Sequence, residues 1–288
     1  MQVSALIRPR PMHALFAHRQ GQALSANRFV ADAVALAAVL PARGHVVNLC
    51  ADRYRFAVGF AAALLRGQVS LLPPNHTPDF VARLAAHYPD VYALRDGDQA
   101  IALPIVDFPE LPAAPASVEV PQVPDDRLAA IVFTSGSQGD PVPNRKYWGL
   151  LVQNAQAEAR RLGVLDRHDL TIVGTVPSQH MYGFESAMLI AMLGGTSFDA
   201  SKPFFPADVA AALDAIDGPR ALVTTPVHLR ALINDGMALP PLEFVLCATA
   251  PLDPALAQAA EAAYGAPLYE IYGCTEAGQI ATRRTTDG

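Results

Sequence analysis

The apolar positions of this chain alternate between two spacings, one typical of strands and one typical of helices. Short apolar or β-branched runs are repeatedly followed by segments in which apolar residues recur every three or four positions. The expected strands cover residues 45–50, 69–72, 91–94, 170–176, 220–225, 243–248 and 267–272, with a short one near Ser197. This alternation predicts an α/β fold with largely parallel sheets covered by helices on both faces.

The expected helices begin and end at recognisable residues. Asp52 should cap a helix that ends at Arg66 before Gly67, and Thr77 with Pro78 should begin one that reaches about His87. Further helices are expected over residues 27–40, 147–162, 184–193, 206–216, 226–233 and 254–265. The prolines between residues 104 and 126 predict an extended surface connection, whereas residues 1–24 carry too little pattern to predict an element.

Composition limits the class of protein. A chain of 288 residues with 51% hydrophobic content can bury a sizeable core. The formal charge is −6 and the basic residues are dispersed, so no footprint for nucleic acid or an anionic membrane is present. Cys50, Cys247 and Cys274 are far apart, which predicts reduced thiols and a cytoplasmic location. The longest apolar run, residues 56–65, is too short to span a membrane, and residues 1–18 lack the apolar core of a signal peptide.

A loop rich in small and hydroxyl-bearing residues follows the apolar run at residues 131–133, which predicts a further strand. From Thr134 it reads Thr-Ser-Gly-Ser-Gln-Gly-Asp-Pro. Glycines permit positive φ, and small side chains let main-chain N–H groups approach phosphate oxygens. A solvated turn is the ordinary alternative for such residues. The loop fits no Walker A, dinucleotide-binding or nucleophile-elbow spacing, so an unrelated α/β hydrolase has little support.

Two further groups of polar residues also come directly after expected strands. Pro177, His180 and Gly183 follow the strand at 170–176, and the run Tyr272-Gly273-Cys274-Thr275-Glu276 follows the strand at 267–272. A lone histidine at such a place is more often structural than catalytic, and Glu276 alone would suit an exposed helix start. Because ligands bind at the carboxyl ends of parallel strands, these groups are candidates for one site.

Together these segments resemble the signatures of adenylate-forming enzymes: acyl- and aryl-CoA synthetases, luciferases and peptide-synthetase adenylation domains. The loop is similar to Thr-Ser-Gly-Ser-Thr-Gly-x-Pro-Lys but has Gln138 for Thr and Val142 for Lys. The second group matches Pro-x-x-His-x-x-Gly, and the third matches Tyr-Gly-x-Thr-Glu without departure. Residues 248–252 and 224–226 are weaker matches to the family's Gly-Gly-Ala-Pro-Leu and Thr-x-Pro segments.

The resemblance implies a role for each matched residue. Thr134 to Gly139 would cover the β- and γ-phosphates of ATP, Thr275 would bond the α-phosphate, and Glu276 would hold Mg²⁺. The implied catalytic residues are His180, Thr275 and Glu276. The implied nucleotide-binding residues are Thr134, Ser135, Gly136, Ser137, Gln138, Gly139, Lys146, Thr249, Ala250, Pro251, Tyr272, Gly273 and Thr275. The implied substrate-binding residues are His180, Tyr182, Phe184, Ala248 and Gly278. Lys146 could replace the missing loop lysine; the alternative for Lys146 is a solvated surface charge.

The resemblance also implies a domain organisation. Residues 1–288 would form the large N-terminal domain, with one α/β subdomain over about 45–165 and a second over about 170–288, against which residues 12–44 pack. The family's β-barrel lobe and its C-terminal domain with a catalytic lysine are expected to be absent. Weakened or absent turnover is expected without them.

The implied activity joins ATP to an organic acid, giving an acyl-adenylate and pyrophosphate, before the acyl group passes to a thiol of CoA or of a carrier protein's phosphopantetheine. An aryl acid such as hydroxybenzoate is expected before a fatty acid, because Tyr182 and Phe184 suit a flat ring. The segment Pro143-Asn144-Arg145-Lys146 resembles the AMP ligases of xanthomonadin and aryl polyene pigment pathways. A non-catalytic binding or scaffolding module of the same fold is the alternative.

Overall fold

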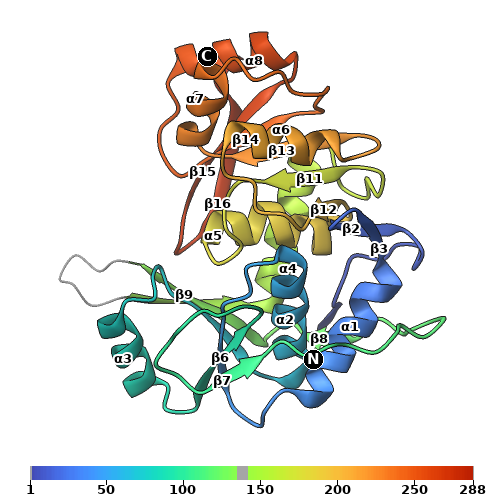
Figure 1. The fold of residues 1–288 in the computed structure, drawn as a ribbon, viewed down its shortest axis with the longest axis vertical. Coiled ribbons are helices and arrows are strands. Elements are labelled where there is room, and N and C mark those ends of the chain that lie inside the picture. The colour runs from blue at the N-terminus through green and yellow to red at the C-terminus, as the bar shows by residue number, and fades with distance from the viewer. Residues whose placement is uncertain (1, 135–141, 288) are drawn as a thin grey trace.

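The computed structural model describes residues 2–134 and 142–287, which form two lobes stacked along the long axis (Figure 1). The lower lobe is built on a six-stranded sheet of order β10-β9-β5-β4-β6-β7. Its strands, in chain order, are β4 (His45–Asn48), β5 (Val69–Leu72), β6 (Val91–Arg95), β7 (Ile105–Asp107), β9 (Leu128–Thr134) and β10 (Val142–Tyr147). Strand β10 pairs with β9 antiparallel, and the remaining pairs are parallel.

The upper lobe is built on an eight-stranded sheet of order β16-β15-β14-β13-β11-β12-β2-β3. Its strands, in chain order, are β2 (Leu15–Arg19), β3 (Gln22–Ser25), β11 (Thr171–Gly174), β12 (Ser197–Asp199), β13 (Arg220–Thr224), β14 (Val245–Cys247), β15 (Leu268–Cys274) and β16 (Gly278–Arg284). The interior pairs are parallel, whereas β2 with β3 and β15 with β16 form antiparallel hairpins at the two edges. The predicted α/β architecture is therefore confirmed.

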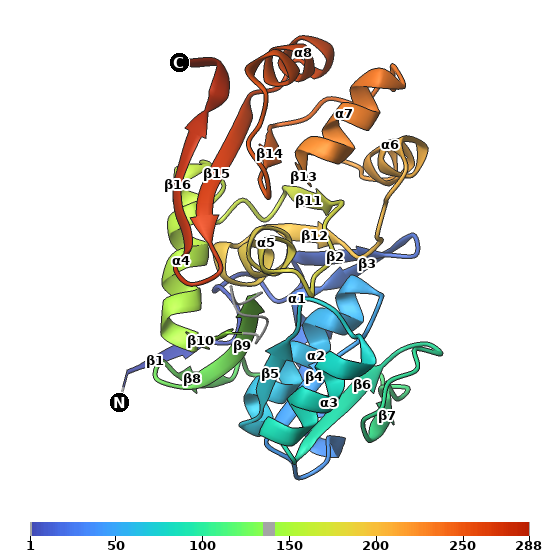
Figure 2. The same cartoon turned by 90° about the vertical axis from the view of Figure 1, so that its left-hand side faces the viewer.

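Helices cover both faces of each sheet (Figure 2). Helix α3 (Pro78–His87) packs on one face of the six-stranded sheet, and α6 (Pro206–Asp214), α7 (Pro226–Asn234) and α8 (Pro254–Tyr264) pack on one face of the eight-stranded sheet. Between the sheets lie α1 (Ala26–Val39), α2 (Arg53–Arg66), α4 (Trp148–Arg161), the short α5 (Met181–Gly183) and the π-helix η1 (Phe184–Gly194). The largest apolar cluster thus spans both lobes, and a smaller cluster lies beneath the outer helices of each lobe.

The predicted end signals of α2 are confirmed at both ends. The Asp52 side chain accepts a hydrogen bond from the backbone N–H of Arg55 at 2.9 Å, and Gly67 adopts φ +80°. A side chain would be strained at that φ, so glycine suits the position. Thr77 does precede α3, but its hydroxyl donates to Asn75 (3.0 Å) and makes no cap bond.

Several short elements lie where the sequence predicts none. Strand β1 (Val3–Ala5) pairs with β8 (Gln122–Pro124), and β2 joins β12 through two residue pairs. The β2–β3 turn places Gln20 and Gly21 at positive φ, as a two-residue hairpin requires. The expected helix over 184–193 is a π-helix, and all of its residues are buried.

The two lobes are joined by a buried arginine on α2. Arg53 donates from Nη2 to the main-chain oxygens of Gly174 (2.8 Å) and Val176 (3.2 Å), at the end of β11. In the aromatic core behind it, Phe60 of α2 and Phe184 of η1 pack edge to face, with ring centroids 5.0 Å apart. This packing fixes the segment that follows β11 relative to the lower lobe.

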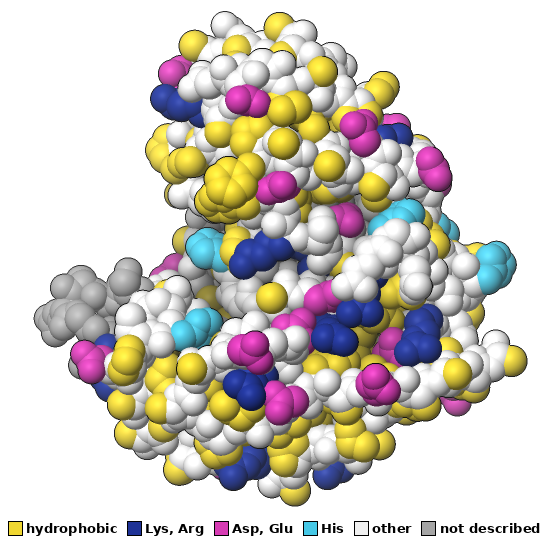
Figure 3. All heavy atoms as spheres, viewed as in Figure 1, with side chains coloured by type: hydrophobic (Ala, Val, Ile, Leu, Met, Phe, Trp, Pro, Cys, Tyr) yellow, Lys and Arg dark blue, Asp and Glu magenta, His cyan; other side chains and the backbone are white. Residues whose placement is uncertain are grey.

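The surface is hollowed where the lobes meet (Figure 3). A cavity of about 380 Å³ opens there, lined by Pro73 and His76 from the lower lobe and by Pro177, His180 and Lys202 from the upper lobe. Within the described ranges, the structure contains no helix long and apolar enough to cross a membrane.

Candidate active site

Three predicted segments converge on one pocket beside the carboxyl ends of the parallel strands. This central pocket has a volume of about 200 Å³. It is lined by His180, Met181, Tyr182, Glu185, Ala248, Thr249, Ile271, Gly273, Cys274, Thr275, Gly278 and Gln279. The second motif, the turn after β14 and the hairpin after β15 all contribute residues, although they are far apart in sequence.

The segment from Pro177 to Gly183 is a tight turn that presents His180. A Cβ added to Gly183 would lie 2.2 Å from the carbonyl oxygen of Pro177, so no side chain fits at that position. Gln179 donates from Nε2 to the oxygen of Cys50 at 2.9 Å, which ties the turn to the lower lobe. His180 is exposed at the mouth of the pocket, and partial desolvation lowers the pKa of its imidazole, which favours the neutral ring.

Tyr182 and Phe184 have different environments, although both were predicted to contact a substrate. Tyr182 lines the central pocket, is buried, and donates its hydroxyl to the oxygen of Leu246 at 2.8 Å. Burial raises the pKa of that phenol, so the hydroxyl stays protonated. Phe184 is fully buried in the core against Phe60, and it does not line the pocket.

The turn after β14 separates the central pocket from a larger hollow. Thr249 adopts φ +86°, a left-handed conformation that is an outlier for a β-branched residue. Its neighbours Ala250 and Pro251 line the hollow, whose volume is about 680 Å³, together with Tyr272. Tyr272 is 73% exposed, so its ring is accessible for stacking on a flat ligand.

The third motif forms the tip of the β15–β16 hairpin. Two glycines let its strands approach: a Cβ on Gly273 would lie 2.5 Å from the oxygen of Gly278, which itself has φ +77°. Thr275 is half-buried and Glu276 is exposed in the turn. No described residue forms an ion pair or hydrogen bond with the Glu276 carboxylate, which leaves its oxygens able to bind a cation.

Lys146 of β10 connects the two sheets at this tip. Its Nζ donates to the carbonyl oxygens of Thr275 (2.5 Å) and Glu276 (3.1 Å). The side chain is 7% exposed, so the interpretation of Lys146 as a solvated surface charge is wrong. Burial also lowers the pKa of this amine. Because two of its three donors bind main-chain oxygens, Lys146 holds the turn in place.

The predicted phosphate loop is defined only by its two ends. Thr134 ends β9 and pairs with Val142, so the loop joins the two strands of a hairpin. The Asn144 amide lies 3.4 Å from the Thr134 hydroxyl. The predicted residues Ser135, Gly136, Ser137, Gln138 and Gly139 lie outside the described residues.

Sequence reasoning missed two buried carboxylates behind the pocket. Glu185, at the start of η1, lines the pocket, and Glu158 of α4 lies nearby. Burial raises the pKa of Glu185 to about 7 and that of Glu158 to about 8. A single acidic residue inside the apolar run at 184–193 was the available signal for Glu185.

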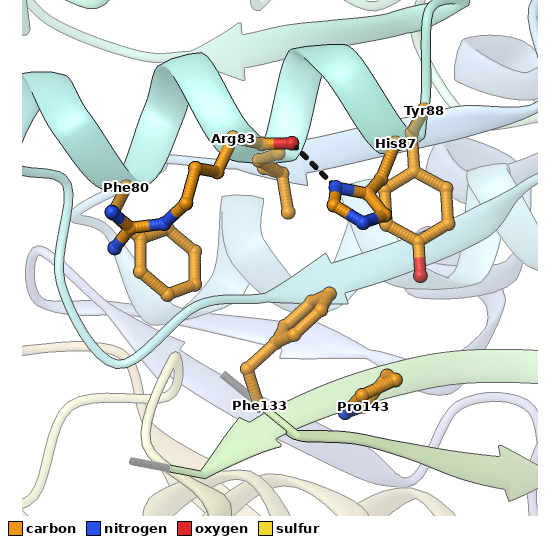
Figure 4. Close-up of a pocket in the computed structure, with 7 residues that line it drawn as sticks. Phe80, Arg83, His87, Tyr88, Phe133 and Pro143 are labelled. Atoms are coloured by element: carbon orange, nitrogen blue, oxygen red, sulfur yellow. Dashed lines mark hydrogen bonds between the residues drawn. The ribbon is translucent and has the colours of Figure 1, made fainter. Parts of the chain in front are cut away.

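A separate cavity of about 210 Å³ lies between α3 and the β9–β10 hairpin (Figure 4). Phe80, Tyr88 and Phe133 form its aromatic wall, and His87 Nδ1 lies 2.9 Å from the backbone oxygen of Arg83 at its edge. None of the predicted site residues lines this cavity. Across residues 2–134 and 142–287, no three His, Cys, Asp or Glu side chains gather as a metal cluster.

Comparison with known proteins gives consistent matches. The profile of AMP-binding enzymes matches residues 7–288. A 4-coumarate–CoA ligase of Rhodobacter capsulatus is 32% identical over 155 residues, which is 54% of this chain and 39% of that protein. A 4-coumarate–CoA ligase of Halorhodospira halophila is 32% identical over 152 residues, covering 52% of this chain and 36% of the relative.

Solved structures share the fold at low sequence identity. O-succinylbenzoate–CoA synthetase of Bacillus subtilis, with a bound product analogue, superposes with a TM-score of 0.80 at 18% identity, covering 95% of this chain and 59% of that one. A malonyl-CoA ligase with methylmalonyl-CoA and AMP bound superposes with a TM-score of 0.80 at 22% identity, covering 98% of this chain and 62% of the ligase. The chain therefore spans less than two thirds of these relatives.

Proposed function

Because the chain belongs to the family of AMP-binding enzymes, which are adenylate-forming ligases, we propose that it binds ATP and an organic acid in the central pocket and the adjoining hollow. The observation that carries this proposal is the convergence of His180, Thr249, Gly273 and Thr275 on one pocket. The adenine would lie in the hollow against Tyr272 and the turn after β14, and the acid would enter the central pocket past His180.

The reaction requires a carboxylate oxygen to form a bond to the α-phosphorus while the bond from that phosphorus to the pyrophosphate oxygen breaks. Charge on the phosphoryl oxygens must be neutralised throughout. The Thr275 hydroxyl would donate to the α-phosphate, and the neutral His180 imidazole would border the attacking carboxylate. Mg²⁺ would supply charge neutralisation, and the exposed, unpaired Glu276 carboxylate among the described residues fits such an ion, which needs one or two protein carboxylates.

The size of the central pocket bears on the acid. Its volume of about 200 Å³ is below the roughly 300–1,000 Å³ common for drug-sized ligands. This favours a compact aryl acid such as hydroxybenzoate over a long fatty acid. The 4-coumarate–CoA ligases, named for an aryl acid, support the same choice.

The acyl acceptor would be CoA or a carrier-protein phosphopantetheine, in the reducing cytoplasm that the three free cysteines suit. The narrower form of the proposal is an acid-activating step in pigment synthesis. It rests on the resemblance of residues 143–146, which form most of β10, to the corresponding segment of AMP ligases in pigment pathways.

The rival function is a scaffold that keeps the fold without binding nucleotide. Calorimetric titration of the chain with MgATP separates the two functions. We expect saturable binding at one site, weakened in Thr275→Val, which removes the hydroxyl at constant shape. Binding should be unchanged in Thr77→Val, because the Thr77 hydroxyl lies just before α3 and donates to Asn75. Absence of heat at millimolar MgATP would favour the scaffold.

A further inference from the structure

Glu185 lines the central pocket and carries a buried, unpaired carboxylate oxygen. The residue is 5% exposed and lines the pocket together with His180 and Tyr182. Within the described chain, its Oε1 has no hydrogen-bond partner. A Cβ built on Gly278 would lie 2.8 Å from that oxygen and 3.1 Å from the Asn154 side-chain nitrogen, so the glycine leaves open space beside the carboxylate.

An unpaired acceptor in such a place costs free energy, because the pocket removes water without replacing its hydrogen bonds. The wall combines apolar side chains with polar ones, but no described residue donates a hydrogen bond to Oε1, and the Gln279 amide donates instead to Ser186 at 2.9 Å. The cation that acts on Glu185 is Lys146, but two of its three donors are held by the main chain of the hairpin turn. A ligand that carries a donor would satisfy the free oxygen.

We propose that Glu185 selects the acid: it accepts a hydrogen bond from a hydroxyl or amino group on an aryl acid whose carboxylate lies near His180. This inference rests on the proposed function and narrows its substrate class to donor-bearing aryl acids. A ring without such a group would leave the carboxylate desolvated and unpaired. Sites built to bond a substrate hydroxyl reject analogues that lack it far more strongly than apolar pockets reject a missing methylene.

Other charged and titratable groups surround Glu185 and must be separated from it in any pH test. They are Lys146 on β10, Glu158 on α4, His180 before α5, Cys274 on β15 and Glu276 in the hairpin turn. Burial raises the pKa of Glu185 to about 7, so its carboxyl passes from neutral to ionised near neutral pH. The ionised form is the stronger acceptor, since charge-assisted hydrogen bonds are roughly twice as strong as neutral ones.

The test compares dissociation constants for 3-hydroxybenzoate, 4-hydroxybenzoate, 4-aminobenzoate and benzoate, measured by calorimetry with MgATP present. We expect the wild-type chain to bind at least one donor-bearing acid about tenfold or more tightly than benzoate. In Glu185→Leu this ratio should fall to near one. In Glu158→Gln, which changes a buried carboxyl that does not line the central pocket, the ratio should be kept.

Glu185→Gln keeps the shape of the side chain and provides a second test in case Glu185→Leu does not fold. The ratio of hydroxybenzoate to benzoate affinity should rise between pH 6 and pH 8 in the wild type and stay flat in Glu185→Gln. Dividing by benzoate cancels the titration of the surrounding groups. Equal wild-type affinity for benzoate and all three substituted acids, or an unchanged affinity ratio in Glu185→Leu, would overturn the inference about Glu185. If the wild-type chain still bound MgATP in that case, the proposed function would stand. A wild-type chain that bound neither MgATP nor any of the acids would overturn the inference and the proposed function together.

Discussion

Replacing Lys146 by methionine should loosen the contact that holds the β15–β16 turn against the lower lobe. The change removes two charged hydrogen bonds, to the oxygens of Thr275 and Glu276, each worth roughly 1.5–3 kcal/mol. Part of this is regained, because the buried amine is itself desolvated and the turn oxygens can accept water. We expect the free energy of unfolding to fall by about 1–2 kcal/mol. MgATP affinity should fall about tenfold, since the turn carries Thr275 and Glu276.

The assay combines urea unfolding with calorimetric MgATP titration, and the chain supplies a matched control. Lys202 is the other lysine of the sequence and is exposed at the rim of the cavity of about 380 Å³ between the lobes. Lys202→Met should change neither quantity appreciably. The reasoning would be refuted by wild-type MgATP affinity in Lys146→Met, or by an equal loss in Lys202→Met.

Three further predictions concern the backbone and the buried acids. Thr249→Gly should raise the free energy of unfolding by about 1 kcal/mol in urea, because it relieves φ +86°; a loss of stability would show that the threonine makes compensating contacts. Gly183→Ala should cost about 2–3 kcal/mol, since its Cβ meets the Pro177 oxygen. Gly163→Ala, with φ +71° and open space around it, should cost about 1–2 kcal/mol; equal losses would contradict the clash. The pKa of Glu158 is about 8 in the folded chain, above its unfolded value of 4.5, so the fold retains a proton that the unfolded chain releases. The Glu158 contribution to stability should therefore fall as pH rises from 5 to 8, whereas the lowered pKa values of His18, His76, His180 and His228 act in the opposite direction. The melting temperature of the wild type relative to that of Glu158→Gln should fall over this range; a difference that stays constant or rises would refute the assignment.

The sequence predicts much of the fold because its signals are local. Asp52, Gly67, Pro78 and Pro254 mark helix ends through the conformation and hydrogen bonding of a few neighbouring residues. The parallel strands are predictable because they are buried on both faces and therefore apolar throughout. Edge strands lack this signal: β10 and β16 are polar along much of their length, so their residues predict no strand.

The sequence predicts most residues of the candidate site but not the contacts between them. Motif order indicates that His180, Thr249, Gly273 and Thr275 belong together, and the structure places them around one pocket. The bond from Lys146 to the hairpin turn joins residues about 130 positions apart, and no local pattern encodes it. Likewise, the helical pattern at 184–193 does not distinguish an α-helix from a π-helix. It therefore could not show that Glu185, and not Phe184, lines the pocket.

The most direct test of the account is a calorimetric titration with a non-hydrolysable mimic of hydroxybenzoyl-adenylate, in which an acyl sulfamate replaces the acyl phosphate. The mimic joins the two ligands that we place in the central pocket and the adjoining hollow. Linking them should make binding about 100-fold or more tighter than binding of AMP or hydroxybenzoate alone, at one site per chain. Binding no tighter than that of AMP, or no saturable binding, would contradict the claim that acid and nucleotide share this site.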